Sequence, residues 1–238
     1  MSDVPESHPR HRSLQLRDRI VAGVDAGVTS IHGLIAHGRG EAFDYLLGEA
    51  THGFAREAID AAATMLRTAK RPVISVNGNA AALVPAELVA LSTALDAPLE
   101  VNIFHTSQGR ETAIQAWMQK HGAASVLMPT REAALDFISS NRRFVNPEGI
   151  LVADVVFVPL EDGDRCEALR RMGKDVVTVD LNPLSRTART ASITIVDNVM
   201  RALPLLLSAV QATETPQATF DSIANLAEAE RCLRAMPA

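Results

Sequence analysis

Aromatic residues are scarce in this chain of 238 residues. They make up 4% of the sequence, with one Trp, one Tyr and seven Phe, whereas hydrophobic residues as a whole make up 47%. The hydrophobic core must therefore consist mainly of Ala, Val, Leu and Ile, a composition that favours helices packed against a sheet. We expect an α/β protein whose length suits one large domain.

Cysteine is almost absent, and long hydrophobic runs are absent altogether. Cys166 and Cys232 lack the spacing of a metal site and cannot staple a domain of this size, so we expect a reducing compartment. No apolar run reaches the length of a membrane span, and Met1 to Ser13 lack the apolar core of a signal peptide. These observations predict a cytoplasmic protein with no membrane partner.

Several common site patterns are missing as well. The seven histidines form no HxxxH or HExxH pair, which argues against zinc. No GxxxxGK(S/T) loop occurs, and Phe43 stands where a dinucleotide fingerprint needs its third glycine. The net charge of −5 argues against nucleic acid as a partner, although four arginines lie between Arg10 and Arg19.

Segments with helix and strand patterns alternate along most of the chain. The expected helices are 16–27, 54–70, 85–96, 114–120, 165–173, 199–212 and 220–236, and the expected strands are 72–78, 99–104, 125–129, 154–160, 175–181 and 192–198. Because strands separated by helices form parallel sheets, we predict a Rossmann-like, largely parallel sheet flanked by helices. Residues 1–211 should form one α/β domain, with a helical part at 1–70 and the Rossmann-like core at 71–211. A linker and a helix follow at 212–238.

Polar side chains gather after two of these expected strands, between Asp180 and Asn198. In open α/β sheets, ligands bind beyond the carboxyl ends of the strands. Asp180 is placed to bond a ribose hydroxyl, and Arg186 and Thr187 are placed to hold phosphate oxygens. The segment therefore predicts a nucleotide site, and the alternative is a polar edge loop whose arginines are solvated.

Two glycine-containing clusters have both a structural and a functional interpretation. His37-Gly38-Arg39-Gly40 belongs to a Gly-rich segment at 33–49. It is either an ordinary turn or a loop whose backbone approaches a phosphate held by Arg39. Asn77-Gly78-Asn79 follows an expected strand, and it is either a turn or a pair of amides that hold a substrate carboxylate or hydroxyl.

A third cluster, Glu161 to Arg165, closes an expected strand and opens a helix. Asp164 fits a helix N-cap, but three carboxylates beside an arginine are costly to gather without a cation, and Mg²⁺ carried by ATP is the expected one. Cys166 lies in the first turn of that helix. We interpret it as a buried packing residue and not as a nucleophile, because no histidine lies near it in the sequence.

Five motifs follow one another in unbroken order. They are SHPR at 7–10, GLIAHGRGEAFDYL at 33–46, PVISVNGNAAALVP at 72–85, VPLEDGDR at 158–165 and DLNPLSRTARTASITIVDN at 180–198. Together they resemble the archaeal-type phosphopantothenate synthetases, the 4-phosphopantoate–β-alanine ligases of coenzyme A biosynthesis. The resemblance runs from about residue 7 to 209, departs between about 105 and 149, and leaves the tail beyond 211 as an addition.

The resemblance implies a homodimeric enzyme that joins 4-phosphopantoate to β-alanine while ATP is split into AMP and pyrophosphate. The ATP contacts of the family fall on Arg17, Arg39, Asp180, Leu181, Asn182, Arg186, Thr187, Asp197 and Asn198. A route through an acyl-adenylate needs no enzyme nucleophile, but it needs cations and hydrogen-bond donors where charge develops.

Roles for individual residues follow as hypotheses. Arg39 and Arg186 are expected to hold the ATP phosphates, and Asp180 and Asn182 to contact the ribose. Asp162 or Asp164 would steady Mg²⁺ or attract the ammonium group of β-alanine, and His37 would deprotonate that group. The candidates for holding phosphopantoate are Asn77, Asn79, His37 and Arg165.

Two other functions fit the same residues. One is a nucleotide-sensing binding module that keeps the ATP site but performs no ligation. The other is an ADP-forming carboxylate–amine ligase that passes through an acyl-phosphate.

Overall fold

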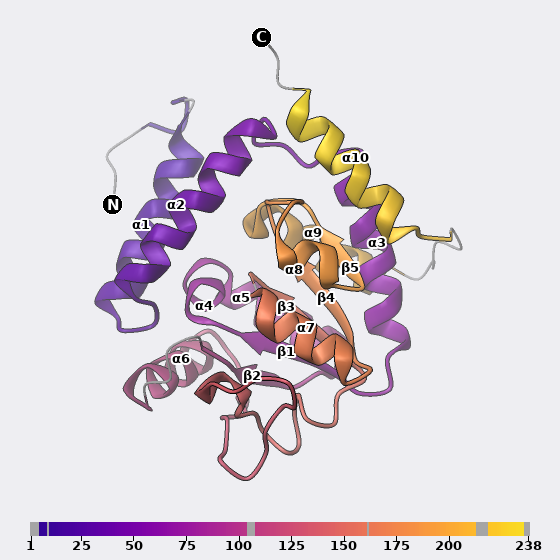
Figure 1. Ribbon diagram of the computed structural model, residues 1–238. Helices are drawn as coiled ribbons and strands as arrows, with labels where there is room; N and C mark the ends of the chain where they lie inside the picture. Colours follow the sequence, from indigo (N-terminus) through magenta and orange to yellow (C-terminus); the bar gives the residue numbers. More distant parts are fainter. Residues whose placement is uncertain (1–4, 9, 104–107, 161, 213–218, 236–238) are drawn as a thin grey trace.

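The centre of the molecule is a five-stranded sheet in which every pairing is parallel (Figure 1). The computed structural model describes residues 5–8, 10–103, 108–160, 162–212 and 219–235. The strands are β1 (Pro72–Val76), β2 (Leu99–Val101), β3 (Val155–Pro159), β4 (Asp175–Val179) and β5 (Ile193–Ile195). Their order in the sheet is β2-β1-β3-β4-β5, which confirms the expected α/β fold with a parallel sheet.

Helices cover both faces of this sheet because the strands are apolar on both sides. The described helices are α1 (His11–Asp25), α2 (Ile31–Leu46), α3 (Gly53–Thr68), α4 (Gly78–Leu83), α5 (Pro85–Leu95), α6 (Gln108–Lys120), α7 (Gly163–Arg171), α8 (Arg186–Thr190), α9 (Val199–Gln211), α10 (Ser222–Arg234) and the 3₁₀ turn η1 (Asn141–Arg143). None of them combines the length and hydrophobicity that a membrane span requires.

Alternation along the strands separates the two sides of the core. Ile74, Phe157 and Val177 pack in a cluster with side chains of α3, α5 and α9. Val156 and Val176 face the opposite side, where α7 and the segment 133–153 cover the sheet. The segment 133–153 therefore closes one face of the core.

The N-terminal helices α1 and α2 stand beside the sheet as an antiparallel pair that contacts the body through α4 (Figure 1). The Gly-rich segment was expected to be a turn or loop, and this prediction is wrong because residues 31–46 form the helix α2. Gly33 is needed for close packing, since a Cβ there would lie 2.3 Å from the Asn79 Oδ1 and Thr29 Oγ1 atoms. Tertiary packing thus overrides the low helix propensity of glycine.

Other local predictions also differ from the structure. The strand expected at 125–129 is reduced to one bridge between Leu127 and Glu100, and the short helix α8 was not foreseen. Asn77-Gly78-Asn79 is neither a turn nor a loop, because Asn77 caps α4, which begins directly after β1. A Cβ at Gly78 would lie 2.6 Å from the carbonyl oxygen of Val28, so only glycine fits there.

The C-terminal helix α10 packs against α3. Ala229 and Leu233 are buried together with Phe54, and the Asn225 side chain donates a hydrogen bond of 2.9 Å to the carbonyl oxygen of Phe54. Arg189 of α8 forms an ion pair with Glu230 at 3.1 Å. The helix expected at 220–236 is present and is joined to the domain along its length.

Candidate active site

A cavity of about 750 Å³ lies beyond the carboxyl ends of the strands. Its walls include Asn77 after β1, Asp162 after β3 and Asp180 after β4, together with residues of α2. In the sheet, β2 lies next to β1 at one edge, and β3, β4 and β5 follow on the other side of β1. The order of strands therefore reverses beside β1. In open α/β sheets such a switch point is where ligands bind.

Most of the site residues expected from the sequence meet in this cavity. Those that line it are His37, Arg39, Asn77, Asn79, Asp162, Arg165, Asp180, Leu181, Asn182, Arg186, Thr187 and Asn198. The lining does not include Arg17, Asp164 or Asp197. Each of them contacts a residue that does line the cavity, namely Glu41, Arg186 and Asn198 respectively. Glu161 lies outside the described residues. No group of three or more His, Cys, Asp or Glu side chains among the described residues is arranged to hold a metal ion.

Asp180 is held in a tight turn after β4. Its carboxylate accepts hydrogen bonds from the Ser185 hydroxyl and from the backbone N–H of Asn182, the latter at 2.9 Å. Burial raises the pKa of the Asp180 carboxyl above its ordinary value, although these bonds and the charge of Arg39 oppose the shift. The turn fixes an acceptor next to the cavity.

The start of α8 places Arg186 opposite the start of α7. Ser185 caps α8 by accepting from the N–H of Ala188 at 2.9 Å, and Arg186 forms an ion pair with Asp164. Gly163 permits this approach, because a Cβ there would lie 2.5 Å from the Nε of Arg186. The Arg186 side chain is 56% exposed, so it remains accessible to an anion in the cavity.

Asp162, and not Asp164 as expected, caps α7. Its side chain accepts from the N–H of Asp164 at 2.8 Å and forms an ion pair with Arg142 at 3.0 Å. Both carboxylates of this cluster are therefore paired with arginines. The positive charge beside Asp162 and Asp164 comes from protein side chains.

Helix α2 supplies one wall of the cavity. Burial lowers the pKa of His37, and Arg17 adds to this shift while Glu41 and Asp44 oppose it. A lowered pKa keeps the imidazole neutral at pH 7, which is the form that accepts a proton. Arg17 donates to both carboxylate oxygens of Glu41, at 3.1 and 2.8 Å, and so supports this wall from outside the lining.

The two asparagines after β1 are engaged within the protein. Asn77 accepts from the N–H of Ala80 at 3.0 Å and donates to the carbonyl oxygen of Pro159 at 2.7 Å. Asn79 accepts from the Thr29 hydroxyl at 2.6 Å and donates to the carbonyl oxygen of Gly33 at 3.0 Å. Their amides join α4 to β3 and to α2, and the role in holding substrate that was expected for them remains a prediction.

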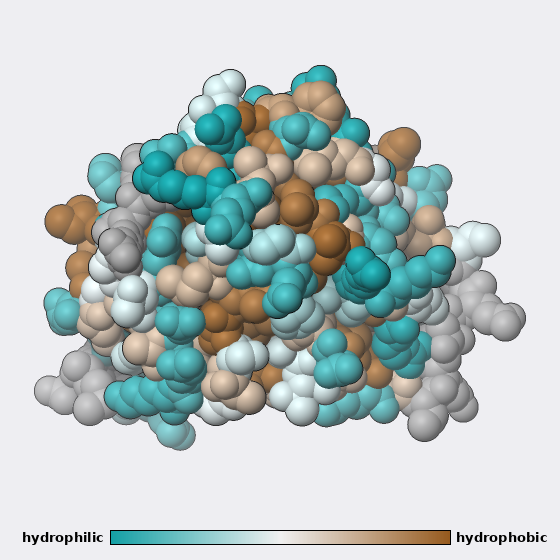
Figure 2. Space-filling view, turned by 90° about the horizontal axis from the view of Figure 1, so that it is seen from below, coloured by the Kyte–Doolittle hydropathy of each residue, from teal (hydrophilic) through white to brown (hydrophobic). Residues whose placement is uncertain are grey.

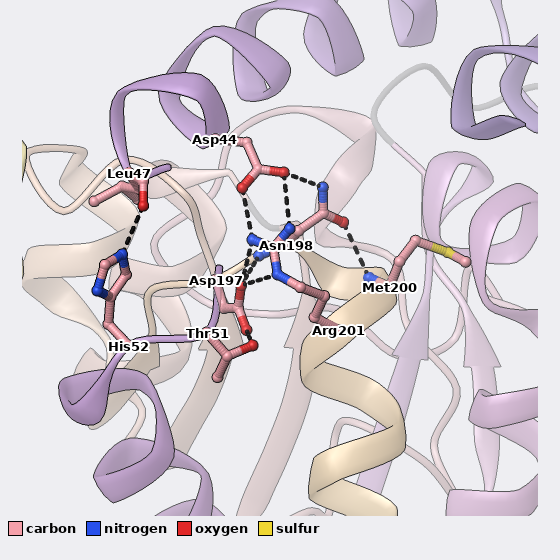
Figure 3. Close-up of polar contacts among 8 residues, drawn as sticks. All are labelled: Asp44, Leu47, Thr51, His52, Asp197, Asn198, Met200 and Arg201. Atoms are coloured by element: carbon pink, nitrogen blue, oxygen red, sulfur yellow. Dashed lines mark hydrogen bonds and ion pairs between the residues drawn. The ribbon is translucent and has the colours of Figure 1, made fainter. Parts of the chain in front are cut away.

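Asp197 and Asn198 belong to an ionic network that ties α2 to α9 (Figure 3). Arg201 donates to Asp44 at 2.6 Å and to Asp197 at 2.8 Å, and Asn198 donates to Asp44 at 2.8 Å while it caps α9. Thr51 donates to the second oxygen of Asp197 at 2.6 Å. Asp197 is 1% exposed, so its carboxylate serves this network.

Several polar residues of the cavity were not selected from the sequence. They include Ser75, Asn102, Arg110 and Arg142. Asn102 directly follows β2, and polar residues directly after a strand were the ones selected from the sequence. Asn102 was missed because the expected strand ran to residue 104 and so included it. Arg142 lies in η1 within a segment that carries no local signal for a site.

Comparison with known proteins gives one consistent result. Residues 54–237 match the model of the phosphopantothenate/pantothenate synthetase family. This range includes α10, so the C-terminal helix is part of the family pattern and the expectation of an added tail is wrong.

Curated relatives extend the similarity. The 4-phosphopantoate–β-alanine ligase of Methanosarcina mazei is 54% identical over 203 residues, which cover 85% of this chain and 80% of the relative. The ligases of the same name from Thermococcus onnurineus and Thermococcus kodakarensis are 52% identical over 207 residues and 51% identical over 210 residues. These alignments cover 86% and 87% of this chain and 78% and 80% of the respective relatives.

Proposed function

Because the chain belongs to the phosphopantothenate/pantothenate synthetase family, we propose that it joins 4-phosphopantoate to β-alanine in coenzyme A biosynthesis. The reaction would consume ATP and yield 4′-phosphopantothenate, AMP and pyrophosphate. The observation that carries the proposal is the cavity at the switch point of the sheet, where arginines from five separate elements converge with the strand-end residues.

The chemistry accounts for the types of residue in the cavity. A carboxylate oxygen of phosphopantoate attacks the α-phosphorus of ATP, and pyrophosphate leaves to give an acyl-adenylate. The neutral amine of β-alanine then attacks the acyl carbon, and AMP leaves as the amide bond forms. No enzyme nucleophile takes part, so the protein must orient the reactants and stabilise negative charge.

The nucleotide is assigned to the end of the cavity at β4 and β5. Asp180 and Asn182 would accept from and donate to the ribose hydroxyls, while Arg186 and Arg39 would hold the phosphates, with Leu181, Thr187 and Asn198 completing the wall. Arg17 and Asp197 would act through Glu41 and Asn198, because they contact those residues and do not line the cavity.

Neutral His37 is the proposed base for the ammonium group of β-alanine. Mg²⁺ fits this site as a companion of the ATP phosphates. Asp162 and Asp164 each pair with an arginine through Oδ1, and a carboxylate in such a pair would still offer oxygen lone pairs to the ion. When bound with ATP, Mg²⁺ would neutralise charge on the phosphates.

We also propose that the protein is a homodimer in which the exposed face of α2 packs against α2 of a second copy. Ile31, Ile35, Gly38, Ala42 and Tyr45 recur every three or four residues on this exposed face, and Ile31 and Ile35 are 69% and 68% exposed. An antiparallel pairing about Gly38 would place Ile31 of each copy near Tyr45 of the other. On the face seen from below in Figure 2, by contrast, hydrophobic areas of the described residues are small and bordered by hydrophilic ones.

Light scattering tests the dimer. Ile35→Glu should convert the protein to monomers. Val152→Glu, at an exposed residue of the segment 133–153, should leave the dimer intact. A wild-type monomer, or a dimer that survives Ile35→Glu, would contradict this assignment.

Labelled ATP tests the reaction. Incubation of ATP labelled at the α-phosphorus with 4-phosphopantoate and β-alanine should give AMP together with phosphopantothenate. Formation of ADP would favour an acyl-phosphate ligase, and ATP binding without turnover would favour a nucleotide-sensing module.

A further inference from the structure

We propose that the end of the cavity at β1 and β2 binds the phosphate of the acid substrate through Asn102, Arg142 and Arg165. This inference rests on the proposed function for the identity of the acid, and it adds two residues that the sequence did not indicate. It also divides the cavity into a phosphate end at β2 and a nucleotide end at β4 and β5.

The register of the sheet brings these groups to one face. Ser75 of β1 pairs with Glu100 of β2, so their side chains lie on the same side of the sheet. Asn102 comes two residues after Glu100, and the backbone N–H of Asn102 continues the ladder by donating to the carbonyl oxygen of Val76 at 2.8 Å. Arg165 reaches this face from α7 and donates to the Ser75 hydroxyl at 3.2 Å.

The side-chain amide of Asn102 lacks a partner that a ligand would supply. Asn102 is 4% exposed and lines the cavity, yet among the described residues its Nδ2 has no hydrogen-bond partner. A buried donor without an acceptor is costly, and such groups mark ligand sites when they face a cavity. Phosphate offers several acceptor oxygens to one donor of this kind.

Two buried guanidinium groups line the same cavity as this amide. Arg165 is 2% exposed and Arg142 is 8% exposed, and both line the cavity. Among the described residues, Asp162 pairs with Arg142, and the oxygens of Glu100 accept from the backbone N–H groups of Asn146 and Ile150 at 2.8 and 2.6 Å. Both guanidinium groups thus line the same cavity as the unpaired amide of Asn102.

The separation of the two ends suits the reaction. Three strand spacings lie between β2 and β4 in the order β2-β1-β3-β4, which is roughly 14 Å across the sheet. An acid whose phosphate is fixed at β2 would extend its carboxylate toward the middle of the cavity. The α-phosphorus of a nucleotide held at β4 would approach the same place from the other side.

The first test compares two acids. Asn102→Ala and Arg142→Lys should each raise the KM for 4-phosphopantoate by about 10-fold or more, since each removes a contact to a charged group. The KM for ATP should stay within about two-fold, and the preference for 4-phosphopantoate over pantoate should shrink by the same factor. Asn182→Ala, at the nucleotide end, is the matched control and should raise the KM for ATP alone. Equal losses on both acids, or a raised KM for ATP in Asn102→Ala, would overturn the inference.

The second test does not depend on the reaction. Calorimetric titration with inorganic phosphate should show binding to the wild type and to Asn182→Ala, and weaker binding to Asn102→Ala and Arg142→Lys. Equal phosphate binding in all four proteins would overturn the proposed phosphate site at β1 and β2, even if the enzyme is active. A wild type that binds phosphate as expected but does not form phosphopantothenate would instead overturn the proposed function and leave the anion site established.

Discussion

His37 combines a place in the cavity wall with a pKa that burial holds below its ordinary value. If the neutral imidazole is the base, kcat/KM for β-alanine should fall as pH drops through the lowered pKa of His37. Activity should therefore persist below pH 6.5, which is the ordinary pKa of a histidine. His37→Gln should remove this acid limb and lower kcat by about 10²-fold or more. Measurement of kcat/KM against pH for the wild type and His37→Gln checks this. His121→Gln is the control, because His121 does not line the cavity. An unchanged limb in His37→Gln would exclude the role.

Cys166 is fully buried between α7 and the sheet, with its Sγ 3.8 Å from the carbonyl oxygen of Thr187. This confirms the interpretation as a packing residue. Cys166→Ala should leave kcat within a few-fold of the wild type and lower the free energy of unfolding by about 0.5–3 kcal/mol. A folded variant that binds ATP normally but loses orders of magnitude in rate would disprove the route without an enzyme nucleophile.

Individual residues also show how far the sequence carries. Asp180, Asn182, Arg186 and Asn198 could be selected because polar residues after buried strands point to the ligand edge of a parallel sheet. The pairing of Asp162 with Arg142 could not, because the two lie 20 positions apart and meet only through the fold. The bond from Thr51 to Asp197 is likewise tertiary, whereas the ion pair of Asp197 with Arg201 spans only four positions and is open to prediction from the sequence.

Helix α10 shows at the scale of elements what an amphipathic pattern can predict. The pattern placed the helix correctly, but only the structure shows its contact with α3. Leu233→Ala should lower the free energy of unfolding by about 2–5 kcal/mol, because Leu233 is 8% exposed within this contact. Ile223→Ala on the same helix is the control, since Ile223 is 83% exposed, and urea denaturation should detect little change there.

The segment 133–153 depends on Glu100, whose carboxylate holds two of its backbone N–H groups. Because burial raises the pKa of Glu100 in the folded state, the unfolded chain releases this proton at lower pH than the folded protein does. The contribution of Glu100 to stability is therefore present below its ordinary pKa and is lost as pH rises through the raised pKa. Glu100→Gln removes the titration.

Unfolding measured in urea across this pH range should show the wild type losing stability relative to Glu100→Gln as pH rises. The amide cannot accept at both positions, so the variant should also be less stable by a constant amount. Parallel curves for the two proteins would show that Glu100 does not titrate in this range.

At the scale of the molecule, the α/β class and the parallel sheet followed from alternating strand and helix patterns. The order β2-β1-β3-β4-β5 did not, because the sequence does not state which strands become neighbours. The helical state of residues 31–46 was missed because three glycines lower its intrinsic propensity, whereas packing on α1 and α4 stabilises it.

Binding of ATP should stabilise the whole molecule. ATP at 100 times its Kd should raise the free energy of unfolding of the wild type by about 2.7 kcal/mol. Arg186→Ala should weaken ATP binding by about one to two decades, so the gain at the same concentration should be about 1.4 kcal/mol or less. Arg189→Ala is the control, because Arg189 lies on the same helix but pairs with Glu230 outside the cavity lining and should not affect binding. Equal ATP protection in wild type and Arg186→Ala would remove Arg186 from the site.

Helix α2 is fixed to the body at both of its ends. The Asn79 amide bonds the carbonyl oxygen of Gly33 near the start, and Arg201 and Asn198 bind Asp44 near the end (Figure 3). A helix held at two points cannot swing away as a hinged flap, so the wall that carries His37 and Arg39 is already in place before any substrate arrives. The conformational entropy of ordering this wall is then lost during folding and not during binding, and each substrate meets a pre-organised surface.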